Sequence, residues 1–134
     1  MARYTIEIAL RWSDMDSFGH VNNCRYMTVL EEARVGVFFK GPHEGAESFR
    51  SGVVVARHEI DYLLPMHYSQ KCEVALWVDR IGGGSFDLAY EVFADGKLAA
   101  RAKTVMVPFD MQGGHSRRLN DSELTYLRTL TDDK

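Results

Sequence analysis

The hydrophobic and polar positions along the chain predict one strand, one long helix, four further strands and a short final helix. Residues 3–12 alternate between apolar and polar side chains, which is typical of a half-buried strand. From Asn23 to Phe39 the apolar residues recur every three or four positions, which is the spacing of one helix face. At about 1.5 Å per residue this helix is roughly 25 Å long, enough to lie across several strands spaced ~4.8 Å apart.

Helix-capping and helix-breaking residues predict where the long helix begins and ends. Asn22 or Asn23 is a suitable helix N-cap, because a short amide side chain accepts a hydrogen bond from a free helix N–H. Gly41-Pro42 is expected to end that helix. The remaining strand-like runs cover residues 53–64, 73–80, 86–92 and 98–106.

Turn signals connect the later strands. The glycines at 82–84 predict a turn, and Asp95-Gly96 predicts a two-residue hairpin because both central positions need a positive φ. We therefore expect the four strands to form a meander. Asn120 and Glu123 have the spacing of a capping box at the start of a short final helix.

This order favours an α+β fold in which an antiparallel sheet curves around one helix. The length of 134 residues predicts one domain over residues 1–134. One helix covers only part of one sheet face, and the other face and the sheet edges need cover. A homodimer or larger assembly is therefore expected.

Composition and charge exclude several classes of protein. The net charge of −3 and the lack of a long basic block argue against a nucleic-acid partner. The adjacent pair Arg117-Arg118 is interpreted as solvated, with contact to a small phosphorylated ligand as the alternative. No segment approaches the ~18–20 apolar residues that span a bilayer, so no membrane association is expected.

The two cysteines and the N-terminus bear on the compartment. Cys24 and Cys72 lack C-x-x-C spacing, so they predict neither a disulfide framework nor a metal site. The N-terminus lacks the apolar core of a signal peptide. We therefore expect a cytoplasmic protein, with Cys24 as a small buried residue rather than a nucleophile.

The stretch ahead of the long helix contains the candidate chemistry. Asp14 and Asp16 precede a Gly-His-Val-Asn-Asn turn at the predicted helix start. A carboxylate can attack a carbonyl or activate water, and free helix N–H groups can stabilise an oxyanion. One short loop therefore contains both parts of an ester or thioester hydrolysis site.

One motif and the order of the elements together resemble a known family. The motif reads Asp14-x-Asp16-x-x-Gly19-His20-Val21-Asn22-Asn23-x-x-Tyr26, followed by Glu31-Glu32-Ala33-Arg34. It resembles the hotdog-fold acyl-CoA thioesterases of the 4-hydroxybenzoyl-CoA thioesterase type. The resemblance implies a hotdog fold, in which a curved antiparallel sheet of about five strands surrounds a long central helix, with a short C-terminal helix.

The resemblance also implies roles for residues. By position in the motif, Asp16 is the catalytic carboxylate, as nucleophile or general base, and the backbone N–H near Asn23 is the oxyanion donor. The substrate is an acyl-CoA, with no metal or organic cofactor, and the site lies at the subunit interface of a homodimer or homotetramer. The candidate substrate-binding residues are His20, Asn22, Val55, Arg57, Arg80 and Ser85.

Structural interpretations compete with these roles. In them, Asp16 is only a turn residue, His20 orders the loop and His58 packs within its strand. Glu31 and Glu32 are interpreted as a solvated helix face that pairs with Arg34. Two other functions remain open: a non-catalytic acyl-CoA-binding protein, and a hotdog dehydratase. Val21-Asn22 departs from the dehydratase pattern Gly-His-Phe-Pro.

Overall fold

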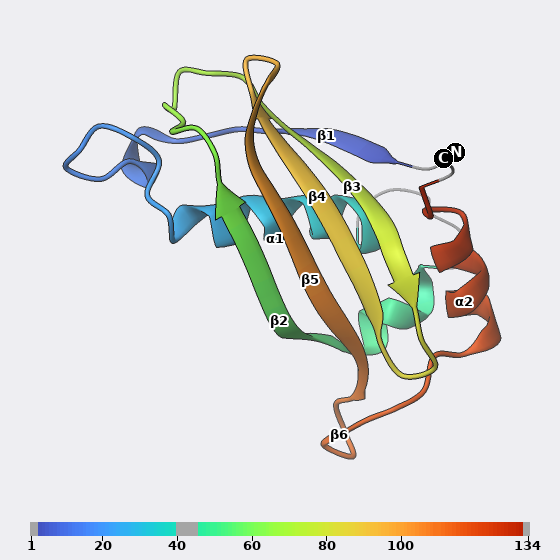
Figure 1. Ribbon diagram of the computed structural model, residues 1–134. Coiled ribbons are helices and arrows are strands. Elements are labelled where there is room, and N and C mark those ends of the chain that lie inside the picture. The colour runs from blue at the N-terminus through green and yellow to red at the C-terminus, as the bar shows by residue number, and fades with distance from the viewer. Residues whose placement is uncertain (1–2, 40–45, 133–134) are drawn as a thin grey trace.

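The computed structural model describes residues 3–39 and 46–132. A curved antiparallel sheet wraps around α1, and α2 lies at one end of the sheet (Figure 1). The predicted α+β arrangement is confirmed. The elements in chain order are β1 (Tyr4–Ile8), η1 (Trp12–Asp14), α1 (Arg25–Phe38), η2 (Glu47–Ser51), β2 (Val53–Tyr62), β3 (Cys72–Ile81), β4 (Phe86–Ala94), β5 (Lys97–Asp110), β6 (His115–Ser116) and α2 (Asp121–Arg128).

The strand order corrects one prediction. The strands lie in the order β1-β3-β4-β5-β2, with the short β6 paired to the end of β5. Only β3, β4 and β5 form a meander, whereas β2 crosses to the far side of β5 and lies at the edge opposite β1 (Figure 1). The reason is that β1 already occupies the free edge of β3, where Tyr4 pairs with Leu76. A periodicity of two reveals a strand but not its neighbour.

The core lies between the inner face of the sheet and α1. Period-two alternation on β4 turns one set of side chains inward, and all are essentially buried: Phe86, Leu88, Tyr90 and Val92. Leu30, Ala33 and Val37 of α1 are equally buried. Because α1 packs against β1 and β3, the inner face of β2 is left only partly covered.

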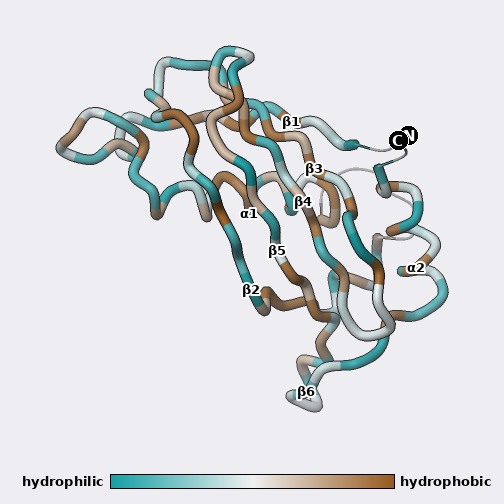
Figure 2. The backbone as a smooth tube through the Cα atoms, viewed as in Figure 1, coloured by the Kyte–Doolittle hydropathy of each residue, from teal (hydrophilic) through white to brown (hydrophobic). Residues whose placement is uncertain are grey.

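Hydrophilic and hydrophobic stretches alternate along the strands (Figure 2), and an open pocket rich in charged residues lies on the outer face of the sheet. Its charged residues include Glu59, Asp61, Asp79, Glu91, Arg101 and Lys103. Charged side chains are readily solvated, so this face does not need the cover that we expected from the sequence. The outer edges of β1 and β2 both lack a neighbouring strand among the described residues.

Turn and cap predictions met different outcomes. The Asp95-Gly96 hairpin is confirmed, with φ values of 49° and 79°. The N-cap prediction is wrong: Cys24 precedes α1 and makes no side-chain cap. Asn22 instead accepts a hydrogen bond of 2.9 Å from the N–H of Cys24. The predicted helix end at Gly41-Pro42 lies outside the described residues, and α1 ends at Phe38.

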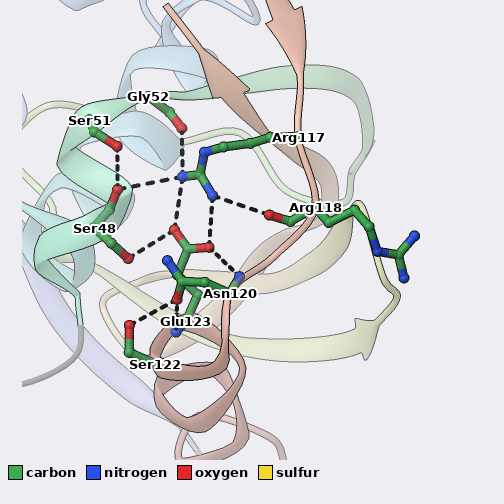
Figure 3. Close-up of polar contacts among 8 residues, drawn as sticks. All are labelled: Ser48, Ser51, Gly52, Arg117, Arg118, Asn120, Ser122 and Glu123. Carbon is green, nitrogen blue, oxygen red and sulfur yellow. Dashed lines mark hydrogen bonds and ion pairs between the residues drawn. The ribbon is translucent and has the colours of Figure 1, made fainter.

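The capping box at α2 is confirmed, and it belongs to a larger network (Figure 3). Asn120 accepts from the N–H of Glu123 at 2.8 Å, and its own N–H donates to the Glu123 carboxylate at 2.9 Å. Arg117 donates to both oxygens of Glu123 at 2.9 Å, and Ser48 of η2 donates at the same distance. Arg117 is therefore not the solvated residue that we expected, whereas Arg118 is exposed.

This network joins α2 to η2 through a fully buried carboxylate. Burial alone would raise the pKa of Glu123. The hydrogen bonds from Arg117, Asn120 and Ser48 outweigh it and hold that pKa below its ordinary 4.5.

No helix among the described residues combines the length and apolar character needed to cross a bilayer.

Candidate active site

The loop between β1 and α1 is organised by Asp14. This residue is 7% exposed, and its carboxylate accepts from the backbone N–H and the guanidinium of Arg11, both at 2.9 Å. Burial by itself would raise the pKa of Asp14, but the hydrogen bonds and charge of Arg11 lower it. Asp14 therefore closes the 3₁₀ turn of η1 and acts as a structural residue.

Asp16 lies in a tight turn closed by the bridge between Met15 and Val21. Its N–H donates to the carbonyl of His20 at 3.0 Å, and Gly19 supplies the positive φ of 81° that the turn requires. The half-buried carboxylate accepts from the N–H of Phe18 at 2.9 Å through one oxygen. Its other oxygen accepts from the Asn22 amide at 3.0 Å.

Asn22 connects this carboxylate to the start of α1. Its side-chain oxygen accepts from the N–H of Cys24 at 2.9 Å, and its carbonyl accepts from Arg25 at 2.9 Å. The N–H of Asn23 has no hydrogen-bond partner within the described part of the chain. One unused backbone donor therefore lies next to the residue that holds the Asp16 carboxylate.

A mostly apolar cavity of about 290 Å³ opens beside this donor. The Tyr62 hydroxyl at the end of β2 donates to the carbonyl of Asn23 at 3.1 Å, and its ring meets that of Tyr26 edge-on at 5.0 Å. The cavity is lined by Val21, Asn23, Tyr26, Tyr62, Leu63, Leu64 and Pro65. Its mostly apolar lining suits an apolar group attached to a carbonyl whose oxygen approaches Asn23.

The other predicted substrate-binding residues lie elsewhere. Val55 is seven residues before Tyr62 on β2, which corresponds to roughly 23 Å of strand. Arg57 pairs with Glu59. Arg80 and Ser85 flank the β3–β4 turn, at the end of the sheet opposite the Asp16 loop (Figure 1). A single chain therefore brings Asp16, His20, Asn22 and Asn23 together, but not Val55, Arg57, Arg80 and Ser85 with them.

Most cationic side chains that could contact a phosphate are already paired with acidic side chains. Arg80 donates to Asp87 at 3.0 and 3.1 Å and to Ser85 at 2.7 Å. Lys103 pairs with Asp79 at 2.9 Å, and Arg101 lies 4.0 Å from Glu91. Arg118 makes no ion pair with any described residue, and its guanidinium lies against Gly83 of the β3–β4 turn.

The structure also bears on three further predictions about single residues. Cys24 is exposed, not buried, because the helix start faces solvent. Arg34 is buried and donates to the Tyr90 hydroxyl at 3.1 Å, so it does not pair with the exposed Glu31 and Glu32. The His20 side chain is exposed and makes no hydrogen bond to the described residues.

Sequence reasoning missed Tyr62 as a residue of this cavity, because an aromatic residue at a strand end carries no local signal of function. Arg118 was considered only as the alternative contact for a phosphorylated ligand. Sequence reasoning also found no metal-ligand pattern, and no group of three His, Cys, Asp or Glu residues suited to a metal ion occurs in residues 3–39 and 46–132.

Comparison with known proteins identifies the family. A family model described as the thioesterase-like superfamily matches residues 10–131, nearly the whole chain. The chain belongs to the thioesterase-like superfamily. A curated relative is an uncharacterized protein, YsmA, from Bacillus subtilis strain 168. It is 26% identical over 87% of this chain and 80% of its own length.

Solved structures of thioesterases establish the hotdog fold for this superfamily member. A predicted thioesterase from Bacillus stearothermophilus superposes with a TM-score of 0.88 at 28% identity, covering 99% of both chains. A thioesterase from Thermus thermophilus, solved with coenzyme A and zinc, superposes with a TM-score of 0.81. It is also 28% identical and covers 93% of this chain and 91% of its own. These matches support thioesterase activity for this protein.

Proposed function

We propose that this protein hydrolyses acyl-CoA thioesters, with Asp16 as the acting carboxylate and the N–H of Asn23 as oxyanion donor. The observation that carries the proposal is the hydrogen-bonded path from Asp16 through Asn22 to the N–H of Cys24. This path holds a carboxylate beside an unused donor and an apolar cavity. The similarity to a thioesterase solved with coenzyme A supports the choice of thioester.

The proposed chemistry begins with the substrate carbonyl oxygen directed at Asn23. Charge that develops on this oxygen is stabilised by the N–H, and one such donor is typically worth roughly 10²–10³ in rate. Each Asp16 oxygen accepts one hydrogen bond from the loop, which leaves a further lone pair on each for reaction. Fixing carboxylate and carbonyl together also lowers the entropic part of the barrier.

Two routes conserve atoms and charge. As a nucleophile, Asp16 attacks the carbonyl carbon, the C–S bond breaks with release of CoA thiolate, and water hydrolyses the mixed anhydride to regenerate the carboxylate. As a general base, Asp16 takes a proton from water while the water oxygen adds to the carbonyl carbon. The C–S bond then breaks, and the proton passes from Asp16 to the departing sulfur. In a single turnover in ¹⁸O-water, label in the Asp16 carboxylate indicates the anhydride route.

We further infer a homodimer in which the two ends of the sheet form one site. The Asp16 loop and the β3–β4 turn lie at opposite ends of each chain, so a two-fold partner can bring one against the other. The open edge of β2, its exposed residues Val55 and Tyr62, and the exposed Leu64 just beyond it favour pairing along that edge. Arg118, which makes no ion pair with a described residue, is then the candidate contact for a CoA phosphate.

The test compares two carboxylates that have the same local role. Asp110 accepts backbone N–H bonds within its turn, as Asp16 does, but lies at the other end of the molecule. We expect Asp16→Asn to lower acyl-CoA hydrolysis about 10²–10⁴-fold while Asp110→Asn stays near the wild-type rate. Equal effects of the two substitutions contradict a catalytic Asp16. Binding without turnover of any acyl-CoA by the wild type supports the non-catalytic alternative instead.

Alkylation of cysteine tests where the ligand binds without relying on turnover. Cys24 is exposed at the proposed site, whereas Cys72 is buried, and burial raises the pKa of its thiol to about 12. Iodoacetamide should therefore label Cys24 alone. We expect an acyl-CoA to slow this labelling in Asp16→Asn, where the ester persists. Unchanged labelling at saturating ester contradicts the proposed binding site.

A further inference from the structure

A chain of hydrogen bonds crosses the core from α1 to the edge strand β2. Arg34 donates to the Tyr90 hydroxyl at 3.1 Å, and that hydroxyl donates to Thr104 Oγ1 at 2.8 Å. Thr104 Oγ1 lies 2.9 Å from Nδ1 of His58. Tyr90 and Thr104 are at most 1% exposed and Arg34 is 9% exposed, so water does not substitute for these partners.

The donor at the beginning of the chain sets the direction of every bond in it. A guanidinium only donates, so the Tyr90 oxygen accepts from Arg34 and its single proton goes to Thr104. The Thr104 proton then goes to Nδ1 of His58. If Nδ1–H donated to Thr104 instead, the buried proton of either Thr104 or Tyr90 would have no acceptor among the described residues, which folded proteins avoid. His58 therefore carries its proton on Nε2.

This Nε2–H is available to a ligand. It has no hydrogen-bond partner among the described residues, and none of their buried side-chain N or O atoms lacks a partner, so Nε2 reaches the surface of the single chain. Burial, and then the charge of Arg34, lower the pKa of His58. The ring thus presents a neutral donor in a fixed tautomer.

The position of this donor relates it to the proposed site. His58, Ile60 and Tyr62 alternate on the inner face of β2, and all three are at least partly exposed because α1 packs under β1 and β3. Tyr62 lines the cavity beside Asn23. His58 is four residues away, roughly 13 Å along the strand. An acyl chain that starts at the N–H of Asn23 and follows this face of β2 reaches His58.

We propose that His58 Nε2–H binds the far end of the acyl group, so that the preferred substrates carry a hydrogen-bond acceptor there. The acyl group is of medium length and ends in a hydroxyl, carbonyl or carboxylate. A plain alkyl chain leaves the donor desolvated and unpaired, which selects against it by roughly 10- to 100-fold in kcat/KM. This inference rests on the proposed thioester hydrolysis and names its substrate class.

The kinetic test uses matched substrates and matched variants. We compare kcat/KM for octanoyl-CoA with the values for its ω-hydroxy and ω-carboxy analogues, which separate a neutral from a charged acceptor. The wild type should favour at least one polar analogue. His58→Phe should lose the preference, and His58→Gln, whose amide keeps a donor near the Nε2 position, should retain part of it. Thr104→Val breaks the chain of hydrogen bonds to His58. Thr5→Val, on the exposed face of β1, is its control.

Two outcomes overturn the inference. One is a wild type that prefers octanoyl-CoA, and the other is a polar preference that survives in His58→Phe. A second readout needs no turnover: ¹⁵N NMR of the histidines should show the Nε2–H tautomer of His58, lost in Thr104→Val. In Asp16→Asn it should show a shift when ω-hydroxyoctanoyl-CoA binds. If this shift occurs without any hydrolysis by the wild type, the proposed reaction fails while the recognition stands. A missing shift overturns the recognition.

Discussion

Two aspartates of the same loop differ in their partners, although they are the same residue type. Asp14 is buried and held by Arg11, whereas the half-buried Asp16 is held by Asn22 and one backbone N–H. Asn22 is the residue that connects the carboxylate to the helix start. Its side chain therefore matters for geometry although it need not touch the reacting atoms.

Asn22→Ala and Asn23→Ala should separate these roles. The first change removes the amide that positions Asp16 and the acceptor for Cys24, so we expect acyl-CoA hydrolysis to fall roughly 10- to 100-fold. The second keeps the backbone N–H and should change the rate by less than about threefold. Steady-state kinetics with one acyl-CoA measure both. A larger loss in Asn23→Ala would assign the chemistry to its side chain instead.

At the scale of elements, Glu123 of α2 joins that helix to η2 through Ser48 and forms an ion pair with Arg117 of the preceding segment (Figure 3). Glu123 is fully buried and receives four side-chain and backbone donors from Arg117, Ser48 and the capping box. The same glutamate thus closes the helix start and connects it to Ser48, 75 residues earlier in sequence. Removing its charge leaves Arg117 without its partner in a partly buried position.

Glu123→Gln should therefore destabilise the fold. Breaking one side of a buried pair typically costs about 3–5 kcal/mol, and we expect about 3 kcal/mol because Arg117 retains some solvent access. Glu59→Gln is the control: its pair with Arg57 is exposed, so the change should stay within about 1 kcal/mol. Urea unfolding followed by circular dichroism measures both. Equal losses would contradict the role of the buried pair.

The same carboxylate predicts a pH dependence of stability. Because the folded pKa of Glu123 lies below its ordinary 4.5, its contribution is fully present above about that pH. It is lost as pH falls through the lower folded value. The free energy of unfolding should therefore decline on acidification below about pH 4.5, and less steeply in Glu123→Gln. Identical slopes in the two proteins would contradict this assignment.

At the scale of the whole molecule, the candidate residues fall into two groups at opposite ends of the sheet (Figure 1). In the proposed homodimer each site takes the Asp16 loop from one chain and the β3–β4 turn, with Arg118, from the other. Damage to the two ends then affects different halves of the same site.

Mixing two damaged proteins should restore activity. Asp16→Asn and Arg118→Glu are each expected to hydrolyse acyl-CoA poorly when substrate is far below KM. After subunit exchange, half of the dimers are heterodimers with one intact site of two, so about a quarter of the wild-type rate should return. Assays before and after exchange measure this. No recovery, although heterodimers are seen by native mass spectrometry, would contradict a site shared between chains.

The sequence by itself determined the elements and the local chemistry. Periods of two and of three to four identify strands and helices because burial of one face requires them. Asp95-Gly96 and Asn120-x-x-Glu123 determine their turn and cap through interactions within four residues. The motif around Asp16 likewise indicated the family, because its loop geometry is built from neighbours in sequence.

Only the tertiary structure decided which distant residues meet. It set β2 beside β5 rather than β3, buried Arg117 against Glu123, and joined Arg34 to His58 through two hydroxyls. It also separated Arg80 and Ser85 from Asp16 by the length of the sheet. Strand pairing and burial of charge depend on contacts between residues far apart in sequence. A local sequence pattern indicates which interactions a residue can make, and the tertiary fold determines the partner with which it makes them.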